Sequence, residues 1–409
     1  MNSYQIDRPA LLKDLFKAYY DTRKTKRNTI TQLTFELDYE HSLSNLCDKL
    51  LSRTYIPSPS ICFITDEPVK REIFASPFLH RVVCRLLYNY INPIFESKMI
   101  YDSYSCRKGK GVWKGVERME HNIRSVTDNW KKNAWVLSAD LQGYFMSINK
   151  DILYCLICDK LNKIWNKSSN IFKGKLLRDV LDVDLINYLL KTIIFRDPTN
   201  DSMAIGSALD WEGLPSSKTL WTREKRVGLA IGDITSQLFS NIYLNEFDQY
   251  VKRELKCHWY GRYVDDFYIL SPSKTFLKER LPSISTFLEQ KLSLKLHPHK
   301  VKIHEVSKGV RFVGAFFLPH RIYASKSSVA RFRKRVHSIN NYILKGEYYK
   351  SYSQFFERGK LLEIESVINS YCGHLSKFKS FNILQREFTT TPLYRFFFFE
   401  KGYAKCHFH

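Results

Sequence analysis

Residues 259–270 form a densely apolar stretch, in which aromatic and aliphatic residues lie on both sides of an adjacent pair of acids. Two such β-favouring runs, joined at Asp265 and Asp266, predict a tight hairpin. The turn would present both carboxylates at the end of a mostly buried sheet. A solvated turn is the alternative interpretation, because Asp is common in turns and a two-residue acidic motif is a weak signal.

Apolar residues at helical spacing predict a helix over about 76–95, with Ser76 as its N-cap and Pro77 at its first position. A long amphipathic helix is predicted after Gly232, where Asp233 or Thr235 could cap it. Helical periodicity is also present at about 10–20, 40–51, 148–160, 182–194 and 274–291.

Short apolar runs predict the strands. Residues 61–65 and 69–74 form two of them, separated by a hairpin signal at 66–68, and residues 134–145 read as a buried strand that ends in Asp140. Strands or turns are also expected at 294–300 and 309–317. Because burying a lone carboxylate is energetically unfavourable, we expect Asp140 to have a partner.

Charge narrows the range of functions. The 409-residue chain carries a net charge of +23, with 25 Tyr and 28 Phe, so a polyanion is the first partner to consider and the rings could stack on bases. The segment 321–409 has sixteen Lys and Arg against six Asp and Glu. Its basic, mostly helical character predicts a separate domain that grips nucleic acid, with an ordinary basic surface as the alternative.

The length predicts two or three subdomains. Neither a transmembrane run nor a signal-peptide pattern is found, so we expect a cytoplasmic protein without a membrane partner. The nine cysteines are interpreted as free thiols. Cys155 and Cys158 form a CxxC without a second pair at zinc spacing, and their apolar neighbours predict core positions.

Asp140 lies 125 residues before Asp265, so only folding can bring these acids together. Three carboxylates in one site repel one another unless cations neutralise them. Mg²⁺ is the hard cation that carboxylate and phosphate oxygens share, and two such ions about 3.5–4 Å apart suit phosphoryl or nucleotidyl transfer. The sequence therefore predicts a two-metal site in a protein charged to hold a polynucleotide.

Four segments in order resemble the A, B, C and E motifs of reverse transcriptases. They are LSADLQGYF, GLAIGDITSQLFSNIYL, GRYVDDFYIL and GVRFVGAFF, and the resemblance covers about residues 60–320. The string IGDITSQ is similar to the Ile-Gly-x-x-x-Ser-Gln of bacterial diversity-generating retroelement enzymes, and KREIF and DSYSCRKGKG resemble their finger motifs. The related "unknown group" enzymes of antiphage defence share much of this pattern.

The resemblance implies an α+β right-hand polymerase with fingers, a palm of antiparallel sheet with helices, and a helical thumb. The expected fingers with an N-terminal extension are residues 1–130, with finger strands near 60–75. The palm is expected at 131–320, with an insertion at about 161–226. Residues 321–409 would be the basic thumb and C-terminal tail.

The resemblance also assigns site residues. It implies Asp140, Asp265 and Asp266 as the catalytic triad, with the Leu141 carbonyl as a further metal ligand. The nucleotide contacts that it implies are Lys70, Arg71, Phe145, Ile231, Gly232, Gln237 and Lys300. The primer grip would be Phe312, Val313 and Gly314.

Three of these roles carry a specific expectation. Phe145 matches the steric gate that excludes ribonucleotides, with plain core packing as the alternative. Ile231 stands where retroviral-type enzymes have Gln, which predicts reduced fidelity, particularly opposite adenine. Lys300 is interpreted either as the acid that protonates pyrophosphate or as a surface lysine. Gly232 could be only a turn glycine, and Gln237 could simply occupy the first helical turn.

The expected function is RNA-directed DNA synthesis from dNTPs with two Mg²⁺ ions, for which Mn²⁺ could substitute. The expected partners are an RNA template, a primer, the cDNA product, a noncoding RNA, a small accessory or partner protein and possible further copies in an oligomer. Error-prone synthesis in a diversity-generating retroelement competes with antiphage defence that uses a dedicated noncoding RNA. Phe145 argues against an RNA-dependent RNA polymerase, and the intact acid triad argues against a non-catalytic RNA-binding scaffold.

Overall fold

The computed structural model describes residues 4–24, 27–66, 69–165, 171–172, 175–348, 358–389, 391, 393 and 396–408. Contacts divide the chain into two units, which are described separately. Unit 1 comprises residues 1–111, 138–269 and 278–302, and unit 2 comprises 112–137, 270–277 and 303–409. Glu67 and Pro68, from the turn predicted at 66–68, lie outside the described residues.

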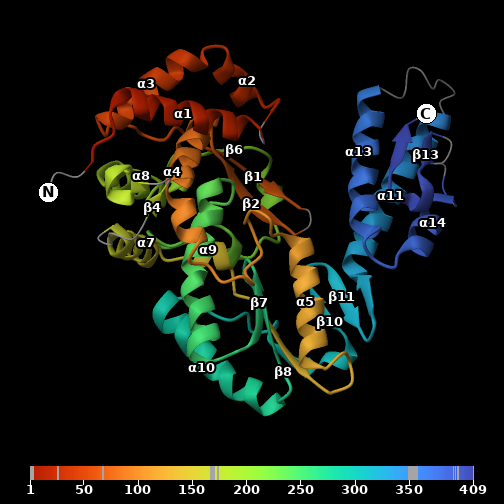
Figure 1. The fold of residues 1–409 in the computed structure, drawn as a ribbon. Coiled ribbons are helices and arrows are strands. Elements are labelled where there is room, and N and C mark those ends of the chain that lie inside the picture. Colours follow the sequence, from red (N-terminus) through yellow and green to blue (C-terminus); the bar gives the residue numbers. More distant parts are fainter. Residues whose placement is uncertain are drawn as a thin grey trace. The chain divides into compact units, whose positions relative to one another are not determined.

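Unit 1 is built around two long helices, α4 (Phe78–Glu96) and α9 (Ile234–Gln249), which pack against each other. The helices α1 (Arg8–Arg23), α2 (Ile30–Glu36) and α3 (Tyr39–Leu51) pack together, and α1 and α2 contact α4 (Figure 1). The face of α4 predicted to be apolar is largely buried. Twelve of the sixteen residues of α9 are buried, so this helix is the central element of the unit.

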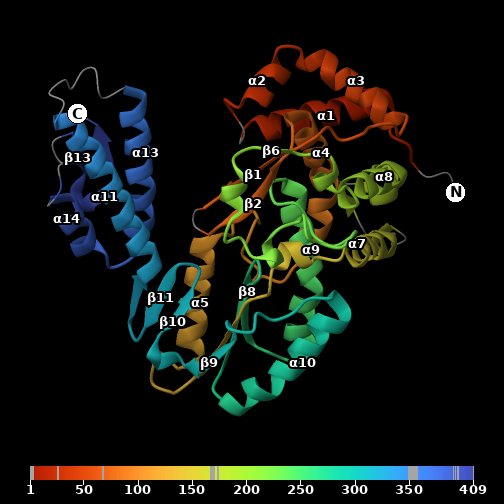
Figure 2. The ribbon, with the colours of Figure 1, turned by 180° about the vertical axis from the view of Figure 1, so that it is seen from behind.

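The remaining helices of unit 1 surround this centre. The helices α7 (Lys150–Trp165) and α8 (Val183–Ile194) pack against each other, α7 against α9 and α8 against α4 (Figure 2). A short helix, α6 (Tyr144–Ser147), precedes α7, and α10 (Lys274–Leu292) follows the acidic hairpin. Single 3₁₀ turns lie at 177–179, 198–200, 208–211 and 216–218, and a π-turn at 250–254 extends α9.

Antiparallel pairs dominate the strands. In unit 1, β1 (Ile61–Thr65) pairs antiparallel with β2 (Arg71–Ala75), and β6 (Met203–Ala204) adds to β1 in parallel. A second sheet has the order β7-β8-β3-β9, formed by Trp259–Tyr263, Asp266–Ser271, Trp135–Ala139 and Lys302–Glu305. The two-residue strands β4 (Ile171–Phe172) and β5 (Lys175–Leu176) form a small ladder. The strand predicted at 134–145 therefore ends at Ala139.

Unit 2 begins with α5 (Val112–Val126) and contains an antiparallel sheet of β10 (Val310–Phe312), β11 (Ala315–Leu318) and β12 (Arg321–Ala324). A 3₁₀ turn at 306–308 precedes β10. The helices α11 (Lys326–Tyr348), α13 (Arg358–Leu375) and α14 (Phe381–Thr389) follow. The strand β13 (Phe397–Phe399) pairs with β14 (Cys406–Phe408) around a 3₁₀ turn at 401–403.

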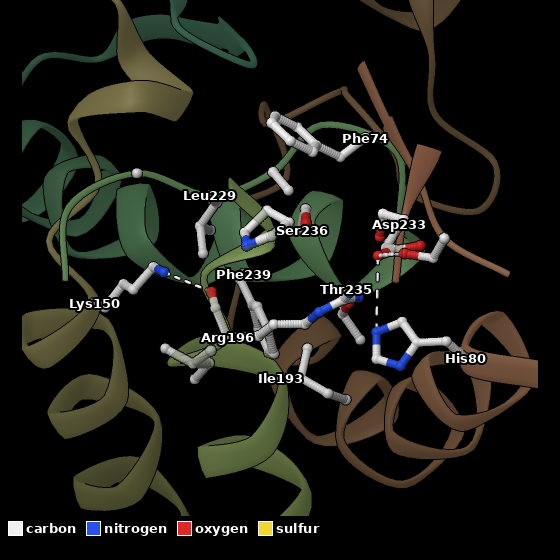
Figure 3. Close-up of a pocket in the computed structure, with 16 residues that line it drawn as sticks. Phe74, His80, Lys150, Ile193, Arg196, Leu229, Asp233, Thr235, Ser236 and Phe239 are labelled. Atoms are coloured by element: carbon white, nitrogen blue, oxygen red, sulfur yellow. Dashed lines mark hydrogen bonds and ion pairs between the residues drawn. The ribbon is translucent and has the colours of Figure 1, made fainter. Parts of the chain in front are cut away.

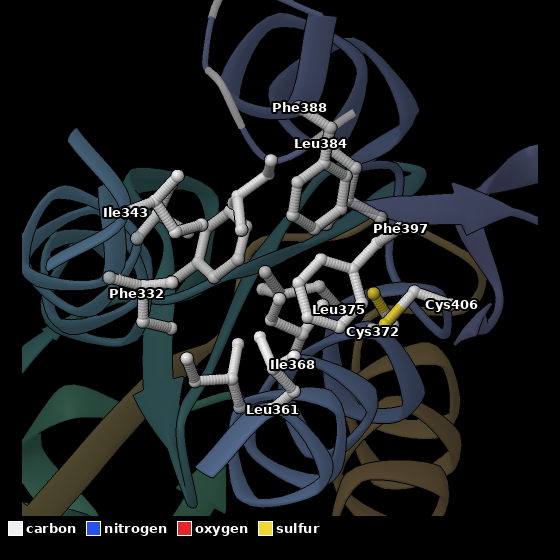
Figure 4. Packing of buried hydrophobic residues seen from close by; sticks show 14 of the residues in the cluster. Phe332, Ile343, Leu361, Ile368, Cys372, Leu375, Leu384, Phe388, Phe397 and Cys406 are labelled. Carbon is white, nitrogen blue, oxygen red and sulfur yellow. The ribbon is translucent and has the colours of Figure 1, made fainter. Parts of the chain in front are cut away.

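The Phe-rich tail packs into the core of unit 2. Phe397 is 1% exposed and lies in one apolar cluster with Phe332, Ile368 and Phe388 (Figure 4). The rings of Phe388 and Phe399 stack with centroids 4.2 Å apart. The tail therefore completes a hydrophobic core through Phe397 and Phe399, whereas Phe398 is exposed.

Two local predictions were wrong, the first because a distant partner binds the residue concerned. Pro77, not Ser76, is the N-cap of α4, because the Ser76 hydroxyl donates to Asp233 Oδ2 at 2.8 Å. Cys155 is exposed and Cys158 only partly buried, because both lie on an outer part of α7, although all nine cysteines are free as expected. Among the described residues, no helix is long and apolar enough to cross a membrane.

Candidate active site

The acidic hairpin turns one residue earlier than predicted. β7 ends at Tyr263, Val264 and Asp265 form the two-residue turn, and Asp266 already begins β8. Val264 has a φ of 58°, a conformation that a β-branched residue adopts only under strain. The surrounding contacts must hold this turn in place, and the carboxylates with it.

A buried ion pair provides that support. Arg262 and Asp248 are 1% and 0% exposed, and the guanidinium binds both carboxylate oxygens, with Nε–Oδ1 at 2.7 Å and Nη2–Oδ2 at 2.6 Å. Arg262 Nη1 also donates to the Val264 carbonyl at 2.8 Å. Tyr260 Oη donates to Asp248 as well, at 2.5 Å. The strained turn is thereby tied to α9.

The pairing of Asp248 with Arg262 was not predicted from the sequence, although both residues are charged residues at core positions. Asp248 is a charged residue on the buried side of α9, and Arg262 interrupts a mostly aromatic strand. Charged residues at core positions are almost always paired. Gly261 is required for a different reason, because a Cβ there would lie 2.6 Å from Tyr268 Oη on the neighbouring strand.

Asp140 immediately follows β3 in a segment paired with residues 295–297. His297 N donates to Asp140 O at 2.8 Å, and Gln142 N donates to Lys295 O at 2.9 Å. The Asp140 side chain is 18% exposed and forms an ion pair with Lys300 through Oδ2. Its Oδ1 is buried without a hydrogen-bond partner. An orphaned carboxylate oxygen of this kind fits a cation ligand.

The three acids lie close enough to affect one another's ionisation. Burial, and next the charge of Asp140, raises the pKa of Asp265 to about 7. Burial, followed by the charges of Asp140 and Asp265, raises the pKa of Asp266 to about 8, although Lys300 opposes this rise. The structure therefore brings together the carboxylates that are far apart in sequence, at a site where positive charge would be favourable.

Of the two finger residues, Arg71 lies nearer to the acids. It is exposed at the start of β2, and its positive charge lowers the pKa of Asp265 against the other effects. Lys70 instead donates to the Glu212 carbonyl at 2.6 Å and lies 3.9 Å from Asp66. Lys300, exposed except for its ion pair, also faces the acids.

Phe145 lies half-buried in α6, five residues after Asp140. Its carbonyl accepts from Leu229 N at 2.8 Å, and the Ile148 carbonyl accepts from Gly228 N at 2.8 Å. These bonds place the segment after β3 beside the glycine-containing segment before α9. Phe145 is therefore close in the fold to the stretch that carries Ile231.

The segment before α9 is bound to β2. Phe74 N donates to Ile231 O at 3.0 Å, and the half-buried Ile231 packs against a cluster that includes Phe74 and Met146. A Cβ at Gly232 would collide with the Phe74 carbonyl, so only glycine fits there. Gln237, one turn into α9, is exposed.

The predicted insertion is anchored by a residue that the sequence analysis missed. Glu72 on β2 is fully buried and accepts from Trp211 Nε1 at 2.9 Å, from Thr219 Oγ1 at 2.8 Å and from Leu220 N at 2.8 Å. The described residues of the 197–226 loop therefore fold back onto β2. The KREIF string contained the signal, because its Glu lies on the buried side of an alternating strand.

The predicted primer grip lies in unit 2. Phe312 ends β10, and Val313 and Gly314 form a two-residue turn to β11 with φ of 42° and 82°. Positive φ at both positions is the geometry that tight hairpins favour. The Gly314 carbonyl accepts from Ser325 N at 2.8 Å, which ties the turn to the start of α11.

Comparisons with known proteins give the class. A family profile described as "Reverse transcriptase (RNA-dependent DNA polymerase)" matches residues 185–317. The curated protein YkfC of Escherichia coli (strain K12) is 25% identical over 325 residues, which cover 71% of this chain and 74% of that protein.

Solved structures of telomerase are similar at lower identity. Apo telomerase from Candida tropicalis, truncated from its C-terminal domain, has 14% identity and a TM-score of 0.44, covering 66% of this chain and 56% of that one. Telomerase from Candida albicans in complex with a TWJ fragment of telomeric RNA has 13% identity and a TM-score of 0.44. The match covers 88% of this chain and 69% of that one. The chain thus spans little more than half the length of the first of these structures.

The fold class expected from the sequence, an α+β right-hand polymerase, is confirmed. The matched segment, residues 185–317, includes Asp265 and Asp266. The enzyme is an RNA-directed DNA polymerase, a nucleotidyltransferase.

Proposed function

We propose that this chain synthesises error-prone cDNA from dNTPs on an RNA template, in a bacterial retroelement of the diversity-generating type. The observation that carries the proposal is the convergence of Asp140, Asp265 and Asp266, with raised pKa values at the latter two. Asp265 and Asp266 lie in the segment 185–317 that matches the reverse transcriptase family. The charge of +23 supports a polynucleotide partner.

Asp140, Asp265 and Asp266 would hold two Mg²⁺ ions or Mn²⁺, with Asp140 and Asp265 as the main ligands and the Leu141 carbonyl assisting. The orphaned Oδ1 of Asp140 and the raised pKa values fit such a role. When bound, the ions would supply the Lewis-acid chemistry that activates the primer 3′-hydroxyl and neutralises the leaving pyrophosphate.

The chain's own side chains would position the incoming nucleotide. Arg71 and Lys70 would bind its triphosphate, for which Lys70 must exchange the Glu212 carbonyl for phosphate oxygens. Lys300 would donate a proton to pyrophosphate; its ion pair with Asp140 holds the ammonium beside the site. Gly232 and Gln237 would lie along the nucleotide.

The same proposal divides the chain by function. Residues 1–130 would be fingers with an N-terminal extension, 131–320 the palm with its insertion, and 321–409 the thumb that grips the duplex through its basic charge. The turn at Phe312, Val313 and Gly314 would hold the primer end. A noncoding RNA and a small accessory protein are the proposed partners.

Replacing Phe145 with Val should admit ribonucleotides. A bulky ring against the sugar C2′ excludes the 2′-hydroxyl, and removing it should raise the ratio of GTP to dGTP incorporation by roughly 10- to 200-fold, the range of a single steric contact in a pocket. Single-nucleotide extension kinetics measure this ratio. Tyr144→Phe is the matched control, because Tyr144 Oη donates to the Ser240 carbonyl inside the core. An unchanged ratio in Phe145→Val would show that Phe145 is only a packing residue.

Replacing Ile231 with Gln should raise fidelity opposite adenine. An aliphatic side chain cannot hydrogen-bond beside the nascent base pair, and one net hydrogen bond of about 0.5–1.5 kcal/mol corresponds to a roughly 2- to 10-fold lower error frequency. Sequencing cDNA copied from a defined template counts the errors. Ile231→Leu keeps the apolar contacts and should leave the error spectrum as it is. Equal error rates in Ile231→Gln and wild type would rule out the idea.

The proposed function is tested by sequencing the nucleic acid that copurifies with the protein, followed by extension with dNTPs and Mg²⁺. A template-repeat RNA whose cDNA carries substitutions at adenines supports diversity generation. A dedicated noncoding RNA without such a repeat would instead assign the enzyme to antiphage defence. Ribonucleotide incorporation as efficient as that of dNTPs would favour an RNA polymerase, and full biological activity of Asp265→Ala would favour a scaffold.

A further inference from the structure

A second group of ligand-type side chains lies in unit 1, apart from the three acids. His80 and Cys84 are one helical turn apart on α4 and are 2% and 0% exposed. Asp233, the residue before α9, faces His80 (Figure 3). One donor atom from each residue lies within 4.8 Å of the other two. Neither the resemblance nor the family match gives these residues a role.

The distances suit a tetrahedral ion. Cys84 Sγ lies 3.5 Å from His80 Nε2, and His80 Nε2 lies 4.0 Å from Asp233 Oδ2. With zinc–nitrogen and zinc–oxygen bonds of about 2.0–2.2 Å and a zinc–sulfur bond of about 2.3 Å, ligand atoms at tetrahedral angles are roughly 3.4–3.6 Å apart. The His80–Asp233 distance of 4.0 Å exceeds this range, so the Asp233 carboxylate must move toward the ion when it binds.

The surrounding hydrogen bonds leave ligand atoms of Asp233 and His80 available for an ion. Asp233 accepts from Ser76 Oγ through Oδ2, whereas its Oδ1 is buried without a hydrogen-bond partner. Tyr55 Oη lies 2.9 Å from His80 Nδ1. This contact is the outer hydrogen bond that orients a metal-binding imidazole and leaves Nε2 for the ion. An orphaned carboxylate oxygen in the interior is costly unless a cation binds it.

A cavity of about 30 Å³ adjoins the group and is lined by His80, Asp233, Thr235 and Arg196 (Figure 3). That volume accommodates one or two waters. Arg196 does not compete for Asp233, because its guanidinium donates to the Ser58 carbonyl at 2.7 Å and to Asp201 at 3.4 Å. The cavity can therefore supply a fourth ligand as water.

We propose that His80, Cys84 and Asp233 bind one zinc ion, with a water from the adjoining cavity as the fourth ligand. Sulfur and imidazole donors favour Zn²⁺ over Mg²⁺, which prefers oxygen ligands alone. Binding replaces the proton of the Cys84 thiol, which is released to solvent as the sulfur–zinc bond forms. The ion would join α4 to the start of α9 and fix the segment that carries Ile231 against β2.

The test is the metal content of the full chain. Protein purified from zinc-supplemented medium and freed of loosely bound metal by gel filtration should hold about one zinc per chain by mass spectrometry. Cys84→Ser and His80→Gln should each lose most of it. Cys47→Ser, which changes another fully buried helical cysteine, should keep it, and so should Asp265→Asn, which weakens the acidic site.

Cobalt substitution provides a readout that needs no variant. Wild type reconstituted with Co²⁺ should show a thiolate-to-cobalt charge-transfer band, and X-ray absorption at the zinc edge should show one sulfur among nitrogen and oxygen ligands. A wild type without zinc and without the cobalt band overturns the proposal, and so does a Cys84→Ser variant that keeps both. In those cases the group is only a hydrogen-bond network. Because none of these readouts uses polymerisation, the result is independent of the proposed function.

Discussion

Asp265→Asn should abolish nucleotide incorporation while making the metal-free protein more stable at pH 8. The activity should fall by at least roughly 10²–10³-fold, because an amide lacks the negative charge that the proposed metal ligand supplies. Primer extension with dNTPs and Mg²⁺ measures this loss. Asp210→Asn, a change to an exposed acid in the 197–226 loop, should leave incorporation near the wild-type rate.

The stability effect follows from the sign of the pKa shift. The pKa of Asp265 rises from an ordinary value of 3.8 to about 7, mainly through burial, so the folded protein favours the protonated carboxyl. Stability from this group is fully present below pH 4 and is lost as the pH rises toward 7. At pH 8 in EDTA, Asp265→Asn should therefore be more stable by about 1–3 kcal/mol. At pH 4 the difference should vanish.

Thermal unfolding in EDTA at the two pH values measures the difference. Mg²⁺ should narrow it at pH 8 by stabilising the wild type, since a cation binds the ionised acids. A wild type that is the more stable of the two at pH 8 without metal would contradict the electrostatic description of the site.

Asp248→Asn should destabilise the protein by about 3–5 kcal/mol, because it leaves the buried Arg262 guanidinium without its counter-charge. Urea unfolding measures this loss. The matched control is Asp48→Asn, which breaks a pair with Arg8 whose side chains are 56% and 46% exposed. That change should have a much smaller effect on stability, because solvent screens an exposed pair. An equal loss of unfolding free energy in the two variants would mean that the buried pair stabilises the protein no more than the exposed pair does.

A double variant separates stability from positioning. Arg262→Met with Asp248→Leu replaces the pair by apolar side chains and should recover most of the stability lost in Asp248→Asn. It also removes the bond from Arg262 Nη1 to the Val264 carbonyl. We therefore expect a low kcat in a well-folded protein. A wild-type kcat in the double variant would show that the turn keeps its geometry without Arg262.

Local patterns in the sequence predicted most of the elements around the site. The hairpin at Asp265 follows from two runs of β-favouring residues and the buried face of α4 from helical periodicity, and both patterns depend only on neighbouring residues. The errors and omissions involve partners far apart in the chain. Ser76 resembles an N-cap, but Asp233, 157 residues later, binds its hydroxyl. No local rule could supply that contact.

The same reason explains the omission of the pairs that support the site. Arg262 and Asp248 each looked out of place in an apolar run, but only the fold shows that each is the other's partner. The partners of Glu72 are likewise known only from the fold, in which the 197–226 loop lies back on β2. An isolated charge at a core position thus indicates a long-range contact, but the sequence does not reveal which residue is the partner.

The contact between Gly232 and the Phe74 carbonyl has an evolutionary consequence. Position 232 allows no side chain, whereas its neighbour Ile231 packs at the edge of an apolar cluster with room for replacement. Under the fidelity role proposed for Ile231, selection for greater or lower copying accuracy would act through changes at 231, while 232 stays invariant. A library randomised at both codons should yield active clones that are diverse at the first position and uniform at the second.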